Sequence, residues 1–144
     1  MNTILILMAM QYLNVPYKWG GNNYDGLDCS GFVLKALHDV GLTLPDMTAH
    51  GLYDYCDKEG YMVTDQSCES LLFFGRGGKI SHVAISLGVV DGKWLMIEAG
   101  GAGEDSKTMT LKELAEKDAR VRIKPVSNRS DLVAEYKLPY REML

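Results

Sequence analysis

Cysteine, proline and excess basic charge are all scarce in this sequence. Of its 144 residues, 3 are Cys and 4 are Pro, while 15 Lys and Arg face 19 Asp and Glu, for a formal charge of −4. Three cysteines cannot all pair within one chain, which favours a reducing compartment over a disulfide framework. The mild negative charge disfavours nucleic acid and anionic membrane surfaces as partners.

A long apolar segment is also lacking at the N-terminus. The apolar run over residues 4–10 is short, and no Lys or Arg precedes it. A helix that spans a bilayer needs about 20 such residues, and a secretory signal needs a basic start and a small-residue cleavage site. We therefore expect no integral membrane segment, a protein made in the cytoplasm, and a first buried helix that ends near Pro16.

The remaining composition is that of a single globular domain. With 47% hydrophobic and 24% charged residues, the chain is long enough to bury one core and too short for two ordinary ones. Because no repeat or linker divides it, the expected domain spans residues 1–144.

The first half of the chain carries helical patterns. Residues 17–28 are rich in Gly, Asn and Asp and predict an ordered loop. Apolar residues at helical spacing over residues 29–41 then predict a helix, which Asp28 would cap and Gly41 would end. A shorter helix is expected over residues 46–57.

The second half changes to a period of two, which is typical of strands. Thr110 and Glu113 predict a capped helix over residues 110–117, and Asp91 with Gly92 predicts a hairpin turn. Strands are expected over residues 71–74, 80–89, 93–99 and 120–126, with a loop at 75–78. Helices followed by an antiparallel sheet predict the α+β class.

Cys29 is the first candidate for chemistry because it falls in the first turn of the helix expected over residues 29–41. Unpaired N–H groups and positive potential at a helix N-terminus favour the reactive thiolate and could hold a developing oxyanion. The negative charge of Asp28 acts against the thiolate. Most free cysteines are small buried hydrophobes, so the position of Cys29 alone leaves both interpretations open.

A base for this thiol must be one of three histidines. His38 lies on the polar side of its helix and is expected to be solvated, and His50 has no evident partner. His82 lies in a strand with one apolar face and one small or polar face, which leaves room for a site. The apolar set is Ser81, Val83, Ile85 and Leu87, and the other set is Ile80, His82, Ala84 and Ser86. His82 is therefore the favoured base, with a buried structural histidine as the alternative.

Glu98 is the candidate third residue, since it is a lone carboxylate within an apolar strand and a carboxylate can hold an imidazole in one tautomer. Its face depends on the hairpin turn. A three-residue loop over residues 90–92 places Glu98 opposite Ala84, on the face of the histidine. A two-residue turn places it opposite Ile85, on the other face. An edge carboxylate in contact with solvent is the remaining alternative.

Three stretches of the sequence carry a resemblance to a known family. They are Pro16-Tyr17-Lys18-Trp19-Gly20-Gly21, Gly26-Leu27-Asp28-Cys29-Ser30-Gly31-Phe32-Val33 and Ile80-Ser81-His82-Val83-Ala84-Ile85. They resemble the NlpC/P60 family of papain-like cysteine peptidases. The resemblance implies a papain-like fold, in which N-terminal helices pack on a central antiparallel sheet and the nucleophilic cysteine begins a helix.

The resemblance also implies roles for individual residues. Cys29 would be the nucleophile and His82 the general base. Tyr17 would bring its hydroxyl near the nucleophile, while Asp28 and Ser30 would contact the polar ends of the substrate.

The resemblance further implies a substrate, because members of the family mostly cut peptidoglycan stem peptides, often between D-glutamate and diaminopimelate or lysine. A stem peptide or muropeptide is therefore the expected partner.

The chain departs from the family where Glu98 replaces the usual His and where residues 67–70 replace a Pro-Gly-Asp turn. A carboxylate can also orient an imidazole, and its charge would raise the pKa of His82, so we expect activity to survive. Trp19 is expected to pack beneath its loop.

Other functions stay open at this point. A papain-like amidase or acyltransferase would use the same thioester on another substrate, and a catalytically silent module could serve a phage structure. No metal or other cofactor is implied, because the cysteines and histidines lack zinc-ligand spacing, and Cys56 and Cys68 are expected to be packing residues. A phage virion or lysis component, a recycling enzyme and a delivered toxin all fit the sequence.

Overall fold

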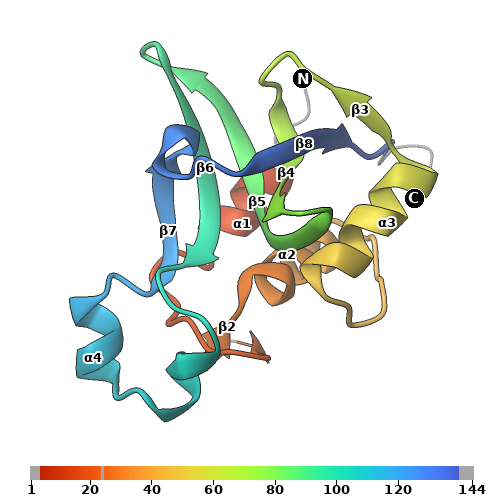
Figure 1. Ribbon diagram of the computed structural model, residues 1–144. Coiled ribbons are helices and arrows are strands. Elements are labelled where there is room, and N and C mark those ends of the chain that lie inside the picture. The colour runs from red at the N-terminus through yellow and green to blue at the C-terminus, as the bar shows by residue number, and fades with distance from the viewer. Residues whose placement is uncertain (1–3, 24, 140–144) are drawn as a thin grey trace.

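The computed structural model of the chain describes residues 4–23 and 25–139. The described helices are α1 (Ile4–Met10), α2 (Cys29–Asp39), α3 (Ala49–Glu59) and α4 (Leu111–Glu116). The described strands are β1 (Asn22–Asn23), β2 (Gly26–Leu27), β3 (Tyr61–Val63), β4 (Cys68–Arg76), β5 (Lys79–Val90), β6 (Lys93–Gly100), β7 (Arg120–Pro125) and β8 (Leu132–Lys137). Two 3-10 turns, η1 (Glu104–Thr108) and η2 (Val126–Asn128), complete the described elements (Figure 1).

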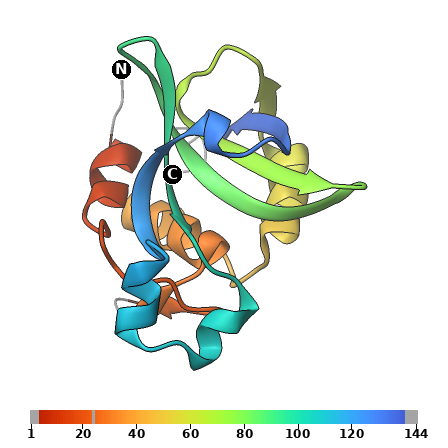
Figure 2. The same cartoon turned by 60° about the vertical axis from the view of Figure 1, so that its left-hand side comes forward.

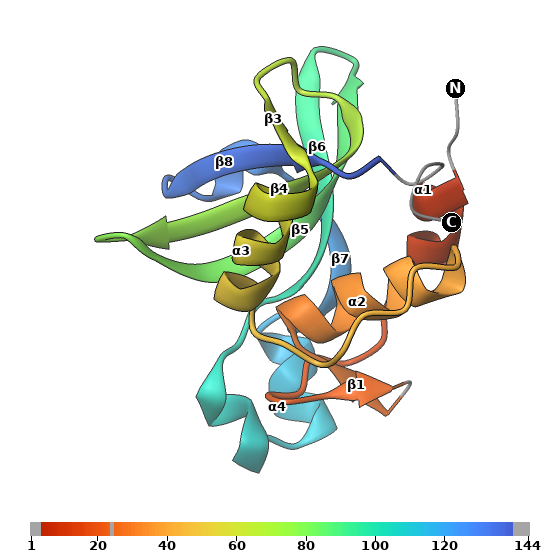
Figure 3. The ribbon, with the colours of Figure 1, turned by 90° about the vertical axis from the view of Figure 1, so that its right-hand side faces the viewer.

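A six-stranded antiparallel sheet forms the centre of the molecule, with strand order β3-β8-β4-β5-β6-β7. Figure 3 shows α1, α2 and α3 on the same side of this sheet. The helices precede most of the strands along the chain, so the predicted α+β class with helices on an antiparallel sheet is confirmed. The small β1–β2 hairpin lies within the segment that was predicted to be an ordered loop.

The main core lies between the helices and the sheet. Phe32, Val33 and Leu37 of α2 are fully buried there, together with Ile85 of β5 and Ile97 of β6. Burying an apolar side chain of this size contributes about 1.5–3 kcal/mol, so α2 is firmly seated against the sheet. A second, smaller core on the opposite sheet face contains Leu72, Phe74, Ala84, Met96 and Val126.

The first helix is less buried than predicted. Leu5 and Ala9 are buried, but Ile4 and Leu7 are 48% and 57% exposed. Because α1 is short and rests on α2 with one side only, its other side faces solvent. None of the helices in the described residues is long and apolar enough to cross a membrane.

The C-terminal strand β8 has no counterpart in the sequence-based prediction. It inserts between β3 and β4, a pairing between distant parts of the chain that local patterns do not reveal. Its buried Glu135 accepts hydrogen bonds from the backbone N–H groups of Gln66 and Ser67, at 3.1 and 2.8 Å, and from the Ser70 hydroxyl. Glu135 thereby holds the turn that precedes β4.

The hairpin between β5 and β6 has the register that puts Glu98 on the face of Ala84, but by a different route from the one expected. Val90 pairs with Lys93 across a two-residue turn, whose residues Asp91 and Gly92 have φ of 50° and 77°. Taken alone, this turn would place Glu98 on the other face. A β-bulge corrects it.

The correcting bulge is at Leu87. Ser86 pairs with Met96 while Gly88 pairs with Leu95, so Leu87 is the residue of β5 in this stretch that has no partner in β6. An extra residue in one strand reverses the alternation beyond it. The three-residue loop was therefore wrong, and a two-residue turn plus one bulge gives the same register.

A second bulge corrects the predicted faces of β5. Phe74 pairs with His82 and Gly75 with Ile80, which leaves Ser81 as the extra residue. As a result Ile80 joins the main core and Ser81 is exposed, the reverse of the prediction. The N–H of Ile80 donates to Nδ1 of His50 at 3.0 Å, so His50 has a structural partner next to this bulge.

Candidate active site

Cys29 is the first residue of α2, as the helical pattern predicted. The side chain of Asp28 caps the helix by accepting from the N–H of Gly31 at 2.7 Å. The Cys29 side chain is 9% exposed, and its Sγ lies 4.0 Å from the carbonyl oxygen of Ser81. The thiol therefore sits where the start of α2 meets the start of β5, with unpaired helix N–H groups beside it.

His82 lies one residue beyond that contact and is buried, with 6% exposure. Its Nε2 is 2.7 Å from Oε1 of Glu98, and its ring packs on Phe74 with centroids 5.5 Å apart. Burial lowers the pKa of His82, but hydrogen bonding to the Cys29 side chain and to Glu98, with their charges, outweighs burial and raises it to about 9. His82 is therefore protonated at neutral pH.

Glu98 lies in β6 with 1% exposure, and both of its oxygens accept hydrogen bonds. Oε1 faces His82, and Oε2 accepts from Nε of Arg122 at 3.0 Å. Burial raises the pKa of Glu98, whereas the bonds and charges of His82 and Arg122 lower it, and the net shift is downward. The carboxylate therefore remains ionised although it is almost completely buried.

The sequence analysis did not single out Arg122. It lies in β7 directly opposite Glu98, and its side chain is 12% exposed. A buried carboxylate in an apolar strand needs a cationic partner. The sequence around Glu98 therefore indicated that a basic residue should lie nearby. Arg120 and Lys124 share the alternation of Arg122 along the strand, however, so the pairing of β6 with β7 was needed to choose among them.

Tyr17 is buried at 4% exposure in the loop before α2. Burial, followed by the charges of Cys29, Asp28 and Asp105, raises the pKa of Tyr17 well above its usual value. The phenol thus keeps its proton at neutral pH and can donate a hydrogen bond. A position of this hydroxyl next to the Cys29 thiol stays a prediction.

Asp28 and Ser30 are occupied by contacts within the chain. Asp28 Oδ1 accepts from Gly31 and from the Ser30 hydroxyl, at 2.7 and 3.3 Å, and Oδ2 accepts from the N–H of Gly20 at 3.0 Å. The carboxylate therefore joins the start of α2 to the Gly-rich loop. Contact of either residue with substrate stays a prediction.

Trp19 does not pack beneath its loop. Its side chain is 45% exposed, and the contact that secures the loop is made by its backbone N–H, which donates to the hydroxyl of Ser106 at 2.9 Å. Figure 2 shows the segment with η1 and α4 beside the β1–β2 hairpin at this end of the molecule. The predicted packing of the indole was therefore wrong, and the loop is joined to η1 through this backbone hydrogen bond.

Cys56, Cys68 and His38 have surroundings of their own. Cys56 is fully buried, and burial raises its pKa to about 12, as fits a packing residue. Cys68 is only partly buried at the start of β4. His38 is exposed and pairs with Thr43 at 2.9 Å, as its predicted solvation implies. Among the described residues, no group of three or more His, Cys, Asp and Glu side chains is placed to hold a metal ion.

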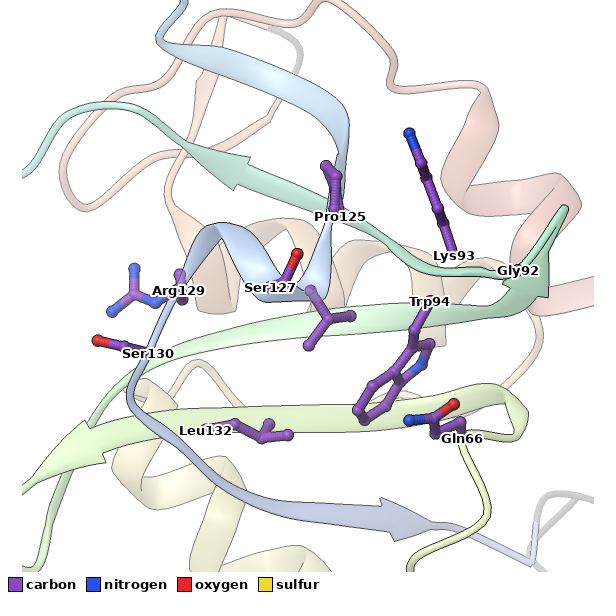
Figure 4. A pocket seen from close by; sticks show the side chains of 10 residues that line it. Gln66, Gly92, Lys93, Trp94, Pro125, Ser127, Arg129, Ser130 and Leu132 are labelled. Carbon is purple, nitrogen blue, oxygen red and sulfur yellow. The ribbon is translucent and has the colours of Figure 1, made fainter.

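Two hollows differ in their relation to these residues. A polar hollow of about 430 Å³ borders His82, Glu98 and Arg122. Another, of about 610 Å³, is lined by Trp94 and Gln66, whose side chains lie next to each other in Figure 4. His82 and Glu98 therefore border the first hollow, and neither lines the second.

The arrangement forms a row of side chains whose charges alternate from His82 onward. The Cys29 thiol adjoins a protonated His82, which adjoins an ionised Glu98, which adjoins Arg122. A nucleophile beside an imidazole that is held by a third group is the geometry of covalent catalysis by acyl transfer.

Known proteins resemble the chain in sequence. The γ-D-glutamyl-L-lysine dipeptidyl-peptidase of Bacillus subtilis is 32% identical over 110 residues, which is 71% of this chain and 33% of that protein. The murein DD-endopeptidase MepH of Escherichia coli is 30% identical over 105 residues, which is 72% of this chain and 38% of that protein. The chain thus spans less than two fifths of these curated relatives.

The fold is shared with solved structures of the same kind. The crystal structure of the NlpC/p60 domain of the peptidoglycan hydrolase SagA superposes with a TM-score of 0.67 at 24% identity, covering 96% of this chain and 100% of that one. The model of the NlpC/P60 family matches residues 14–129, a range that contains Cys29, His82 and Glu98. The chain therefore belongs to the NlpC/P60 family.

Proposed function

We propose that this protein is a cysteine peptidase that hydrolyses peptide bonds in the stem peptides of peptidoglycan. Cys29 is the nucleophile, His82 the general base and acid, and Glu98 the carboxylate that holds the imidazole. The observation that carries the proposal is the 2.7 Å contact between Nε2 of His82 and Oε1 of Glu98, with Sγ of Cys29 lying 4.0 Å from the carbonyl oxygen of Ser81, the residue before His82. Relatives named for peptidoglycan cleavage support the substrate class.

The first half-reaction forms a thioester. The attacking form of a cysteine is the thiolate, and the imidazolium of His82 holds the proton that the thiol gives up. The sulfur attacks the carbonyl carbon, a C–S bond forms, and negative charge moves to the carbonyl oxygen. His82 then gives its proton to the leaving nitrogen, the C–N bond breaks, and the amine departs.

The second half-reaction releases the acyl group. His82, now neutral, takes a proton from water as the water oxygen attacks the thioester, and the C–S bond breaks to restore the thiolate. Glu98 keeps one ring orientation through both steps by binding Nε2. With Nε2 occupied, Nδ1 is the nitrogen that exchanges protons with thiol, amine and water.

Charge on the carbonyl oxygen must be stabilised in both steps. The backbone N–H groups of Cys29 and Ser30, in the first turn of α2, are suited to this role. Tyr17 is a second donor, because burial holds its pKa above the usual value and keeps its hydroxyl protonated. These groups are fixed before substrate arrives, which is what makes such stabilisation effective.

We propose the bond between D-glutamate and diaminopimelate or lysine as the site of cleavage. The name of the Bacillus subtilis relative, a γ-D-glutamyl-L-lysine dipeptidyl-peptidase, supports this choice. The name of MepH, a murein DD-endopeptidase, indicates a different bond. The two bonds yield products of different mass, so one experiment distinguishes them.

The experiment is mass spectrometry of purified muropeptides after incubation with wild-type protein, with Cys29→Ala and with Cys68→Ala as a matched control. We expect fragments split at D-glutamate with the wild type and with Cys68→Ala, and none with Cys29→Ala. Fragments that carry a new amine instead of water would identify an acyltransferase. Intact muropeptides from the wild type would contradict the proposal.

A further inference from the structure

The proposed mechanism assigns a role to Glu98 but none to Arg122, the buried cation that binds it. We propose that Arg122 is a positioning residue of the active site: anchored by Asp118, its guanidinium holds Glu98 ionised and turned with Oε1 toward His82. The inference rests on the proposed function for its effect on turnover. Its structural part can be tested without any substrate.

The geometry gives each oxygen of Glu98 a separate partner. Oε1 is 2.7 Å from His82, and Oε2 is 3.0 Å from Nε of Arg122. The side chains of Glu98 and Arg122 are 2% and 12% exposed. With both oxygens engaged, rotation of the carboxylate would break a charged hydrogen bond inside the protein, where such bonds are worth more than in water.

Arg122 is itself held in place. Nη1 of Arg122 donates to the backbone carbonyl of Asp118 at 3.1 Å and lies 3.5 Å from the carboxylate of the same residue. Hydrogen bonds from Arg120 and Lys124 lower the pKa of Asp118 to about 2, so Asp118 carries its charge throughout the neutral range. The guanidinium thus spans an exposed anchor and a buried carboxylate.

A buried carboxylate needs this support more than a buried neutral residue would. Removing an ion from water costs several kcal/mol unless a partner of opposite charge compensates. His82 is one such partner, but its proton moves during the proposed reaction. Arg122 has a guanidinium that keeps its proton under all working conditions, so Glu98 retains one permanent counter-charge when His82 becomes neutral.

Other charged groups nearby do not take over this role. Asp118, Arg120 and Lys124 form a cluster whose contacts with Glu98 pass through Arg122. Arg129, after η2, lines the same hollow of about 430 Å³, but its Nε and Nη2 donate to the two carboxylate oxygens of Asp131. Beyond His82, the Cys29 side chain is the remaining titratable neighbour from α2.

The first test compares Arg122→Gln with Arg76→Gln, an exposed arginine whose side chain bonds Ser130. We expect Arg122→Gln to lower kcat by about 10- to 100-fold, the range found when groups that orient a ligating side chain are lost, with KM nearly unchanged. Because the Arg122 charge lowers the pKa of Glu98, its loss should shift the acid limb of kcat/KM to higher pH. Arg76→Gln should leave both quantities as in the wild type.

Two further variants separate positioning from simple support of the fold. Arg122→Lys keeps the charge but not the planar fork, so its acid limb should stay near that of the wild type while kcat recovers only in part. Arg122→Ala should regain activity when millimolar guanidinium chloride is added, since the adjacent hollow admits the ion. A wild-type acid limb and kcat in Arg122→Gln would overturn the proposal.

A measurement on the wild type covers the case in which the variants do not fold, and it needs no activity. In nitrogen-15 NMR spectra, the Nε–H of Arg122 should exchange with water more slowly than that of Arg76 at neutral pH, and this difference should shrink as Glu98 takes up its proton on acidification. The exposed Arg76 serves as the reference. If Arg122 Nε–H exchanges with water as fast as that of Arg76 at every pH, Arg122 does not hold Glu98 and the proposal fails, whether or not the protein is a peptidase.

Discussion

Nε2 of His82 lies 2.7 Å from Oε1 of Glu98, although the two residues belong to opposite arms of a hairpin and are 16 positions apart in the chain. The contact depends on two local features of that hairpin. A two-residue turn sets the alternation of β6 one way, and the bulge at Leu87 reverses it. The candidate active site is therefore built by backbone irregularity as much as by the side chains themselves.

The high pKa of His82 predicts an alkaline limit to activity. Its imidazolium must protonate the leaving amine, and its pKa is raised to about 9, so the protonated form predominates below that pH and is lost as pH rises through it. We expect kcat/KM to fall as pH increases through about 9. A profile in which kcat/KM falls instead near pH 6.5, the ordinary value for histidine, would contradict the assignment.

Replacing Glu98 by Gln should weaken the imidazolium. The amide cannot compensate the charge on His82, so the pKa of His82 falls and the alkaline limb of kcat/KM moves to lower pH. We expect kcat/KM to drop by more than about tenfold, which corresponds to at least about 1.4 kcal/mol of transition-state stabilisation. Steady-state kinetics on a soluble stem peptide measure both effects. An unchanged pH profile would show that Glu98 serves only the fold.

Gly88 lies in the bulge with φ of +78°, a conformation that side chains disfavour. An added Cβ would meet Cys68 at 3.6 Å, an ordinary contact, so the cost of Gly88→Ala is backbone strain rather than a collision. We expect the free energy of unfolding to fall by about 1–2 kcal/mol. Gly88→Asn should lose less, because Asn tolerates this region better. Equal stability of Gly88→Ala and wild type in urea unfolding would show that the bulge does not require glycine at position 88.

Asp28 should contribute to stability as a helix cap. Asp28→Ala removes the acceptor for Gly31 and should lower the free energy of unfolding by about 0.5–2 kcal/mol, whereas Asn caps about as well as Asp. Urea unfolding under reducing conditions compares the three proteins. If Asp28→Asn is stable but inactive, the charge of Asp28 also serves the substrate, as the family resemblance implies. No loss of stability in Asp28→Ala would argue against capping.

The part of the site that sequence could predict is the part built by local interactions. Helix α2 follows from apolar spacing, and its start follows from Asp28 as a cap, so the place of Cys29 needed no knowledge of distant residues. The capping box of Thr110 and Glu113 was predictable for the same reason and is present. Such features depend on residues within one turn of each other.

What sequence did not predict depends on contacts between distant segments. The bulge at Ser81 is defined by the pairing of β5 with β4, and His50 of α3 binds the adjacent backbone N–H of Ile80. The selection of Arg122 over Arg120 requires the register of β7 against β6. The side chain of Trp19 is exposed, and its backbone N–H donates to Ser106, far along the chain. No pattern within a short window contains this information.

The most direct measurement is a search for the covalent intermediate. Wild-type protein mixed with a stem peptide is quenched in acid within the first turnover, digested and mapped by mass spectrometry. We expect the acyl half of the substrate to be attached to the peptide that contains Cys29. Cys29→Ala should form no adduct and no product. Product formation by Cys29→Ala, or an adduct on Cys68 alone, would contradict it.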